Sequence, residues 1–156
     1  MKRRIASAVL AASILAAPAL ADQVGEFSND WVGNGVVVEA FPDPGVQGVT
    51  CHVARFSRSL IDRVTKGNWF EDPSNASIAC RQTGPLVIGD IETGDEGEDI
   101  FGQRLSLVFK SLAVRRIWDQ KNQTLVYVVY SKQITEGSAK IAISTVSTFG
   151  QDVRKE

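Results

Sequence analysis

One histidine limits the catalytic chemistry open to this chain. A serine or cysteine nucleophile needs a neighbouring base, and His52 is the only histidine that could act as one. In an extended strand its same-face neighbours are Thr50 and Ala54, and neither is a partner for a catalytic imidazole. The pattern favours a polar residue on the less buried face of a strand, so we predict no catalytic role for His52.

Carboxylates are the second source of chemistry. Glu39 and Asp43 lie near the end of one predicted strand, and Glu136 lies in a later turn. A pair of carboxylates can act as general acid and general base if the fold brings them together. These three residues are the candidates if the protein is an enzyme, which is the alternative to a binding domain.

A dense acidic segment runs from Gly89 to Asp99. Its carboxylates could offer the hard oxygen ligands that calcium prefers, but the order of ligands and glycine found in an EF-hand is absent. Charges this close together are more typical of a solvated, mobile loop, so we predict no metal site. The acidic residues are Asp90, Glu92, Asp95, Glu96, Glu98 and Asp99.

Two adjacent arginines, Arg115 and Arg116, fall in the middle of a predicted strand and must point to opposite faces. With Arg81 and Lys110 they could line a pocket for an anion. The alternative, which the sequence favours, is that they are charges at the rim of the sheet.

Aromatic residues and one glycosylation-like motif complete the candidate binding residues. Trp31, Trp69 and Trp118 are predicted in the core rather than on a ligand platform, with Trp31 holding the polar N-terminal segment against the domain. Asn75-Ala76-Ser77 fits the pattern of a glycosylation site, and we interpret this match as chance.

The first residues have the three parts of a cleavable export signal. Residues 2–4 form a positive head, and residues 5–17 are apolar apart from two serines. Pro18 and the small side chains of Ala19-Leu20-Ala21 predict cleavage after Ala21. The apolar run is shorter than the roughly 20 residues that span a bilayer, although an uncleaved anchor is the alternative. We therefore predict a signal peptide over 1–21 and a single domain over 22–156.

Loss of the signal changes the charge of the chain. Removal of Lys2, Arg3 and Arg4 lowers the basic residues from 17 to 14 against 18 acidic ones, which gives a net charge of −4. Nucleic acids and anionic membranes are bound by clustered positive charge. We therefore predict that neither is a partner, and no later segment is apolar enough for a membrane span.

The chain contains two cysteines, Cys51 and Cys80. An even number of cysteines in an exported protein favours a disulfide, here across a loop of about 30 residues that would contribute about 3–4 kcal/mol. The spacing is far from Cys-x-x-Cys, which argues against a redox pair, and one histidine is too few for a structural zinc site. We predict a structural disulfide.

Clusters of Gly, Pro, Asp and Asn divide the domain into short β-branched and apolar segments. Val49, Cys51 and Val53 alternate with polar or small residues, and both faces of 124–131 are apolar, as in a central strand covered on both sides. A short helix is predicted over 57–67, and 151–156 reads as a loose tail. Strands are predicted over 36–41, 49–56, 77–82, 86–88, 105–110, 112–118, 124–131 and 140–149, with Gly84-Pro85 ending the third.

Short turns between strands favour antiparallel pairing. The expected fold class is mainly β, an antiparallel sandwich or a partly open barrel of about seven or eight strands with one short helix.

Several segments in order along the domain form a characteristic set. They are Val37-Val38-Glu39-Ala40-Phe41 with Asp43-Pro44, Val49-Thr50-Cys51, Ile78-Ala79-Cys80-Arg81-Gln82 with Gly84-Pro85, then 106–112, 130–132, 136–138 and 142–144. This set resembles the CreA family, small bacterial periplasmic proteins named for a catabolite regulation operon. The chain departs from the family pattern at Ala139, where a proline is expected, and at Ile141, where an asparagine is expected.

The resemblance implies a periplasmic domain of unknown biochemical function and no established catalytic residues. The leading hypothesis is a non-enzymatic binding or envelope-associated domain, without cofactor, metal or catalytic site, that binds a protein or a small ligand and is a monomer. The alternatives are a carboxylate-dependent enzyme and a stress-linked envelope factor whose disulfide is maintained by the oxidation machinery.

Overall fold

The computed structural model describes residues 21–31, 33–57, 59, 64–65, 75–101, 112–132, 140–151 and 154–155. Residues 1–20 of the signal predicted over 1–21 therefore lie outside the described residues, as do the predicted strand over 105–110 and the turn at 136–138. No helix among the described residues is long and apolar enough to cross a membrane.

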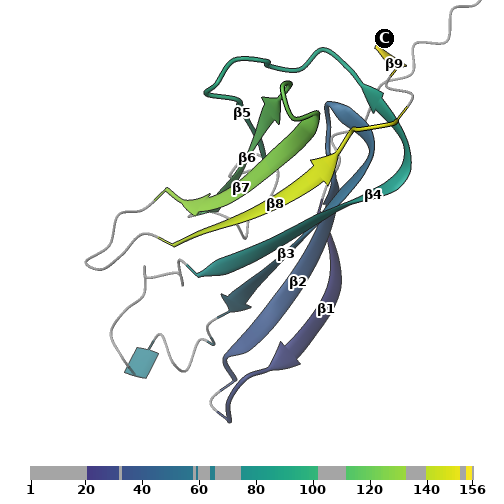
Figure 1. The fold of residues 1–156 in the computed structure, drawn as a ribbon. Coiled ribbons are helices and arrows are strands. Elements are labelled where there is room, and N and C mark those ends of the chain that lie inside the picture. Colours follow the sequence, from purple (N-terminus) through teal and green to yellow (C-terminus); the bar gives the residue numbers. More distant parts are fainter. Residues whose placement is uncertain are drawn as a thin grey trace, which may run out of the picture.

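The strands form two sheets (Figure 1). All neighbouring strands pair antiparallel except β4 and β9, which pair parallel. The first sheet contains, in order, β1 (Asp22–Ser28), β2 (Gly35–Pro42), β3 (Val46–Ser57), β4 (Ala76–Ile88) and β9 (Arg154–Lys155); the second contains β5 (Glu98–Phe101), β6 (Leu112–Asp119), β7 (Thr124–Ser131) and β8 (Ile141–Ser147).

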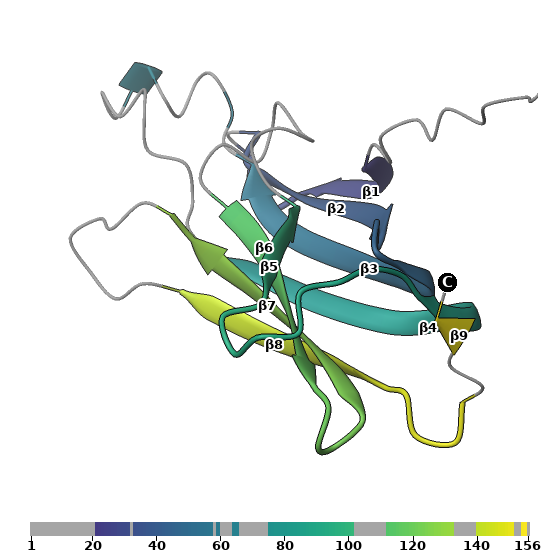
Figure 2. The same ribbon diagram turned by 90° about the horizontal axis from the view of Figure 1, so that it is seen from above.

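The two sheets face each other, and Figure 2 shows the strands of the second sheet crossing those of the first at an angle. β4 of the first sheet and the edge strand β8 of the second lie side by side, where the backbone N–H of Cys80 donates to the Ser144 hydroxyl at 2.8 Å. The predicted mainly β, sandwich-like fold is confirmed, and the described strands do not close into a barrel.

The core lies between the sheets and follows the alternation of the strands. Val49, Cys51 and Val53 are buried, whereas His52 on the opposite face is exposed, as the sequence predicts. The other members come from both sheets. They include Phe41, Val46, Ile78, Cys80, Leu86 and Ile88 from the first sheet, and Ile100, Phe101, Leu112, Val114, Leu125, Tyr127, Val129 and Val146 from the second.

The prediction that Gly84-Pro85 ends a strand is wrong, because β4 continues to Ile88. The pairing with β3 passes from Val49↔Gln82 to Gln47↔Val87, so several residues of β4 bulge around the single residue Gly48. A side chain at Gly48 would collide with the Pro85 carbonyl, and its φ is +80°. A bulge is one of the few places where a sheet accepts proline, since a ladder hydrogen bond is already missing there.

Both ends of the domain differ from the prediction. The polar N-terminal segment forms β1, and Trp31 is 95% exposed rather than packed on the body. The short β1–β2 loop closes on itself, with the Asn29 N–H donating to the Asn34 carbonyl at 2.7 Å, and so leaves Trp31 in solvent. At the other end, part of the predicted loose tail pairs with β4 as β9.

Two further elements are only partly as predicted. One face of β7 is buried, but Val126, Val128 and Tyr130 on the other face are half-buried, so the strand is central without being fully covered. Of the helix predicted over 57–67, Ser57 belongs to β3 and Val64 and Thr65 are helical; most of the rest lies outside the described residues.

Candidate functional site

Cys51 and Cys80 form the disulfide that the sequence predicts. They are register partners on β3 and β4, and both are fully buried in the core between the sheets. A thiolate must reach a sulfur atom to exchange with it, and burial denies that access in the folded state. The bond therefore joins two strands of the core and is not a surface redox centre.

An arginine lies in the same core. The guanidinium of Arg116 on β6 is 2% exposed and forms ion pairs with the carboxylates of Asp43 and Glu98. Asp43 lies in the β2–β3 turn and Glu98 begins β5, so the cluster links the two sheets. A buried charge is costly unless it is paired, and the two carboxylates supply the pairing.

Asp43 is the centre of this arginine cluster. Its Oδ2 accepts a hydrogen bond from the Tyr127 hydroxyl at 2.7 Å. Its Oδ1 also accepts the backbone N–H groups of Gly45 at 2.8 Å and Val46 at 3.1 Å, which fixes the turn. Both oxygens of the buried Asp43 carboxylate therefore accept hydrogen bonds from within the protein.

Burial and the charges in the arginine cluster shift the pKa values of Arg116 and Tyr127. Burial opposes the charge of Arg116, but Asp43 and Glu98 outweigh that effect and raise the pKa of the guanidinium. Burial, together with the negative charge of Asp43, raises the pKa of the Tyr127 hydroxyl, so it remains a hydrogen-bond donor at neutral pH.

The expectation that Arg115 and Arg116 are rim charges is correct for only one of them. They do point to opposite faces: the Arg115 side chain is 38% exposed and pairs with Asp99 at 2.9 Å. Arg116 follows Val114 on the inner face and is buried with it. The even spacing of Arg116 from buried Val114 is the sequence signal that could have indicated this position.

The acidic loop is anchored at its end, contrary to the prediction of a mobile segment. Asp99 pairs with Arg115 and, at 3.1 Å, with Lys132, and it accepts the Tyr130 hydroxyl at 3.0 Å. Burial raises the pKa of Asp99, but these partners outweigh it and hold the pKa below its usual value. Within the described part of the chain, no group of three or more His, Cys, Asp or Glu residues is arranged to hold a metal.

The structure does not bring the carboxylates proposed for catalysis together in one cavity. Glu39 is buried and pairs with Arg55 at 3.1 Å, on the inner face of the first sheet, whereas Asp43 pairs with Arg116. Glu136 lies outside the described residues. Each of the two described carboxylates is thus neutralised by its own arginine.

The remaining sequence candidates are scattered. Arg81 is exposed and donates to the Cys80 carbonyl at 2.8 Å, and Lys110 and Trp69 lie outside the described residues. Trp118 packs against the core as predicted, and Asn75 is exposed just before β4. Arg81 is exposed on β4, Arg115 is partly exposed on β6 and Arg116 is buried, so these three described residues do not line one pocket for an anion.

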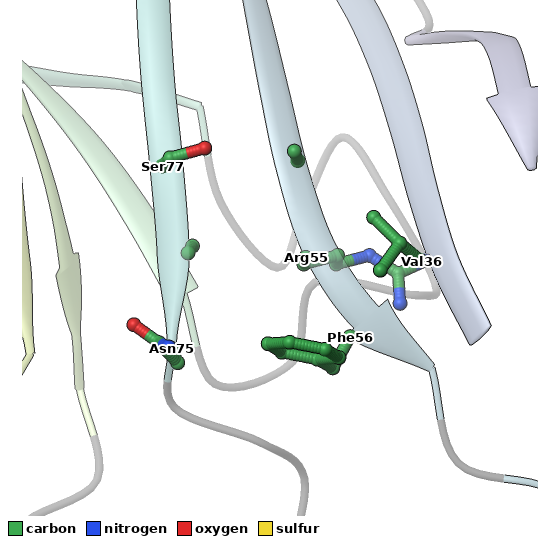
Figure 3. A pocket seen from close by; sticks show the side chains of 7 residues that line it. Val36, Arg55, Phe56, Asn75 and Ser77 are labelled. Atoms are coloured by element: carbon green, nitrogen blue, oxygen red, sulfur yellow. The ribbon is translucent and has the colours of Figure 1, made fainter. Parts of the chain in front are cut away.

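A hollow of about 210 Å³ opens where β2, β3 and β4 extend beyond the second sheet (Figure 3). Its apolar lining includes Val36 and Phe56, and its polar lining includes Arg55, Asn75 and Ser77. Figure 3 shows the ring of Phe56 between Asn75 and Val36. We call this feature the strand-end hollow; sequence analysis did not find it, because its lining comes from strands paired across the sheet.

An apolar row leads to the strand-end hollow along the outer face of the first sheet. Phe27 is paired with Val36, and Val36 with Phe56, so the three side chains lie side by side across β1, β2 and β3. Phe27 is 58% exposed and Phe56 is 39% exposed. The row and the hollow together form a surface that could contact a ligand.

Comparison with known proteins identifies the relatives of this chain. Residues 24–151 match the family described as CreA protein. Protein CreA of Escherichia coli K12 is 48% identical over 115 residues, covering 71% of each chain, and the CreA proteins of strains O6:H1 and O157:H7 match equally well. No solved structure matches. The match covers both cysteines, the Asp43 turn and all strands from β2 to β8, and the chain belongs to the CreA family.

Proposed function

We propose that the protein is exported to the periplasm, is cleaved after Ala21 and acts there as a non-enzymatic binding domain. The export signal described above supports the first part. β1 begins at Asp22, so cleavage after Ala21 would leave the whole strand in place. An oxidising compartment is also where a disulfide such as Cys51–Cys80 forms and persists.

One observation carries the binding role: the apolar row of Phe27, Val36 and Phe56 leads into the strand-end hollow. Exposed aromatic side chains cost free energy in water, and their alignment beside a concave surface is typical of protein interaction sites. The hollow is open and below the range of about 300–1,000 Å³ usual for small-ligand pockets. A protein partner is therefore the better candidate than a small molecule.

The carboxylates support binding rather than catalysis. A general acid or base must reach its substrate, but Glu39 and Asp43 are buried and held by Arg55 and Arg116. Ser77 contributes a hydroxyl to the lining of the strand-end hollow, but no described residue in that lining is a base that could activate it. The surface is suited to contact rather than to proton transfer.

Photo-cross-linking in intact cells tests the binding site. A photoreactive amino acid at position 56 is expected to trap a defined partner protein, and Phe56→Asp in the purified proteins is expected to abolish binding of that partner. Position 145 is the matched control, because Thr145 is exposed on β8 in the other sheet. Equal trapping at positions 56 and 145, or binding that survives Phe56→Asp, would contradict the proposed surface.

Cell fractionation with intact-mass measurement tests the location. The proposal predicts a periplasmic protein whose N-terminus is Asp22. A cytoplasmic protein, or one that retains residues 1–21 in the membrane fraction, would contradict it.

A further inference from the structure

A second hollow lies between the acidic loop and the β6–β7 turn. Its volume is about 420 Å³, within the range of about 300–1,000 Å³ common for small-ligand sites. Thr93 and Asp95 line it from the loop, Ile117 and Trp118 from β6, and Gln120 from the turn. We call it the turn hollow; it is separate in sequence from the strand-end hollow and does not depend on it.

The wall formed by the β6–β7 turn is held by its own hydrogen bonds. The Asp119 carboxylate accepts the backbone N–H of Asn122 at 3.0 Å and its side-chain amide at 2.6 Å. The backbone N–H and the hydroxyl of buried Thr148 both donate to the Gln123 carbonyl at 2.8 Å. The turn is therefore ordered without a ligand.

The wall formed by the acidic loop is fixed as well. Gly94 donates its N–H to the Glu92 carboxylate at 2.8 Å, and Gly97 donates to the Gly94 carbonyl at 3.1 Å. Gly97 lies so close to β6 that a side chain there would collide with the Arg116 carbonyl. A site between two fixed walls loses little entropy when it is filled.

Several polar side chains in the turn hollow form no hydrogen bond with the described residues. The side chains of Thr93, Asp95 and Gln120 have no hydrogen-bond partner within the part of the chain that the structure describes. Lys121 adds an ammonium donor to the same lining. The set contains a hydroxyl, a carboxylate, an amide and an ammonium group, so it can both donate and accept hydrogen bonds.

The apolar part of the lining narrows the class of ligand. Ile117 and the half-buried Trp118, which also packs against the core, line the hollow together with these polar residues. The faces of a sugar ring carry C–H groups, whose partial positive charge suits the negative face of an indole, and its edge carries hydroxyls that donate and accept. Two carboxylates, Asp95 and Asp119, outnumber the one ammonium group and disfavour an anion.

We propose that the turn hollow binds a neutral saccharide. Asp95 and Gln120 hydrogen-bond its hydroxyls, Trp118 contacts a face of the ring, and Lys121 donates at the edge.

Ligand-observed NMR and calorimetry with the exported protein test this proposal. The probes are glucose, N-acetylglucosamine and maltose, with glucuronate as the anionic comparison and choline as the cationic one. At least one neutral sugar is expected to bind saturably with a dissociation constant in the millimolar range or below. Asp95→Ala and Gln120→Ala are each expected to weaken it about tenfold or more, since each removes a direct hydrogen bond.

Glu96→Ala is the matched control. It removes one negative charge from the same exposed loop without touching the hollow, so it is expected to leave sugar binding unchanged. All three variants alter exposed side chains, and their circular dichroism and unfolding midpoints are expected to match the unchanged protein. The absence of binding by every neutral sugar at about 10 mM, tighter binding of choline or glucuronate, or equal binding by all three variants would overturn the proposal.

Discussion

The two ends of the first sheet are built from the same strands but present their apolar side chains on opposite faces. At one end β2 and β3 lie under the second sheet, where Phe41 stacks on Phe101 with ring centroids 4.2 Å apart. At the other end Phe27 and Phe56 are exposed around the strand-end hollow. Phe41 faces the second sheet, whereas Phe27 and Phe56 lie on the outer face of the first sheet, so the face that an apolar side chain occupies decides whether it becomes core or contact surface.

Each end also contains an arginine paired with acid, and the two pairs differ in depth. The Arg116 side chain is 2% exposed and is shared by Asp43 and Glu98, whereas the paired side chains of Arg55 and Glu39 are 11% and 8% exposed. The deeper arginine joins strands of the second sheet to the β2–β3 turn of the first. The shallower one joins neighbouring strands of one sheet.

Removal of the deeper arginine should have the largest effect on stability. Arg116→Ala leaves the Asp43 carboxylate buried without its cation, and we expect a loss of about 3–5 kcal/mol in the free energy of unfolding. Urea unfolding followed by circular dichroism measures it. The neighbour provides the control, because Arg115→Ala breaks a partly exposed pair and should cost about 1 kcal/mol or less. Similar losses for both arginines would remove the distinction between buried and surface pairing.

The disulfide should contribute nearly as much to the free energy of unfolding as Arg116 does. Cys51→Ala combined with Cys80→Ala removes a bond whose cysteines are 29 positions apart, and we expect a loss of about 3–4 kcal/mol. Thermal and urea unfolding of the double variant measure the change. A loss below about 1 kcal/mol would mean that β3 and β4 are held together by their pairing alone.

A single methyl group should disturb the arginine cluster. A Cβ at Gly45 would lie 2.8 Å from Arg116 Nη2 and 2.9 Å from the Ile91 side chain, so Gly45→Ala is expected to cost about 1–3 kcal/mol. Gly25→Ala is the control, because a Cβ at that position in β1 meets no atom within 4 Å. An unchanged unfolding midpoint for Gly45→Ala would show that the turn is not packed tightly against Arg116.

Lowering the pH should weaken the ion pair between Asp99 and Arg115. The pKa of Asp99 is lower in the folded protein than in the unfolded chain, so its stabilising effect is present above about pH 3.9 and is lost as the pH falls through the folded pKa. The difference in stability between the unchanged protein and Asp99→Asn should therefore shrink as the pH is lowered from neutral toward about pH 3. Unfolding midpoints across this pH range measure the difference in stability. A difference that grows in acid would contradict the lowered pKa of Asp99.

The parts that sequence analysis predicted are those encoded by neighbouring residues. The alternation of Val49, Cys51 and Val53 is local, and it correctly gave the buried face of β3. The pairing of Cys51 with Cys80 needed only the count of cysteines and the export signal. Local pattern was sufficient wherever one strand carried the whole signal.

The parts that it missed depend on distant partners. The burial of Arg116 requires Asp43, which is 73 positions away, and the continuation of β4 through Pro85 requires Gly48 on another strand. The strand-end hollow requires the register that sets Val36 beside Phe56. In each case the decisive fact is which strands meet, and no short segment contains it.

The stability of Phe56→Asp tests the contrast between the two ends most directly. If Phe56 belongs to a contact surface, this substitution should change the free energy of unfolding by about 1 kcal/mol or less, far below the loss for Arg116→Ala. Urea unfolding of the two variants side by side gives the answer. A loss for Phe56→Asp of about 3 kcal/mol or more would show that this end is core, and would contradict the account.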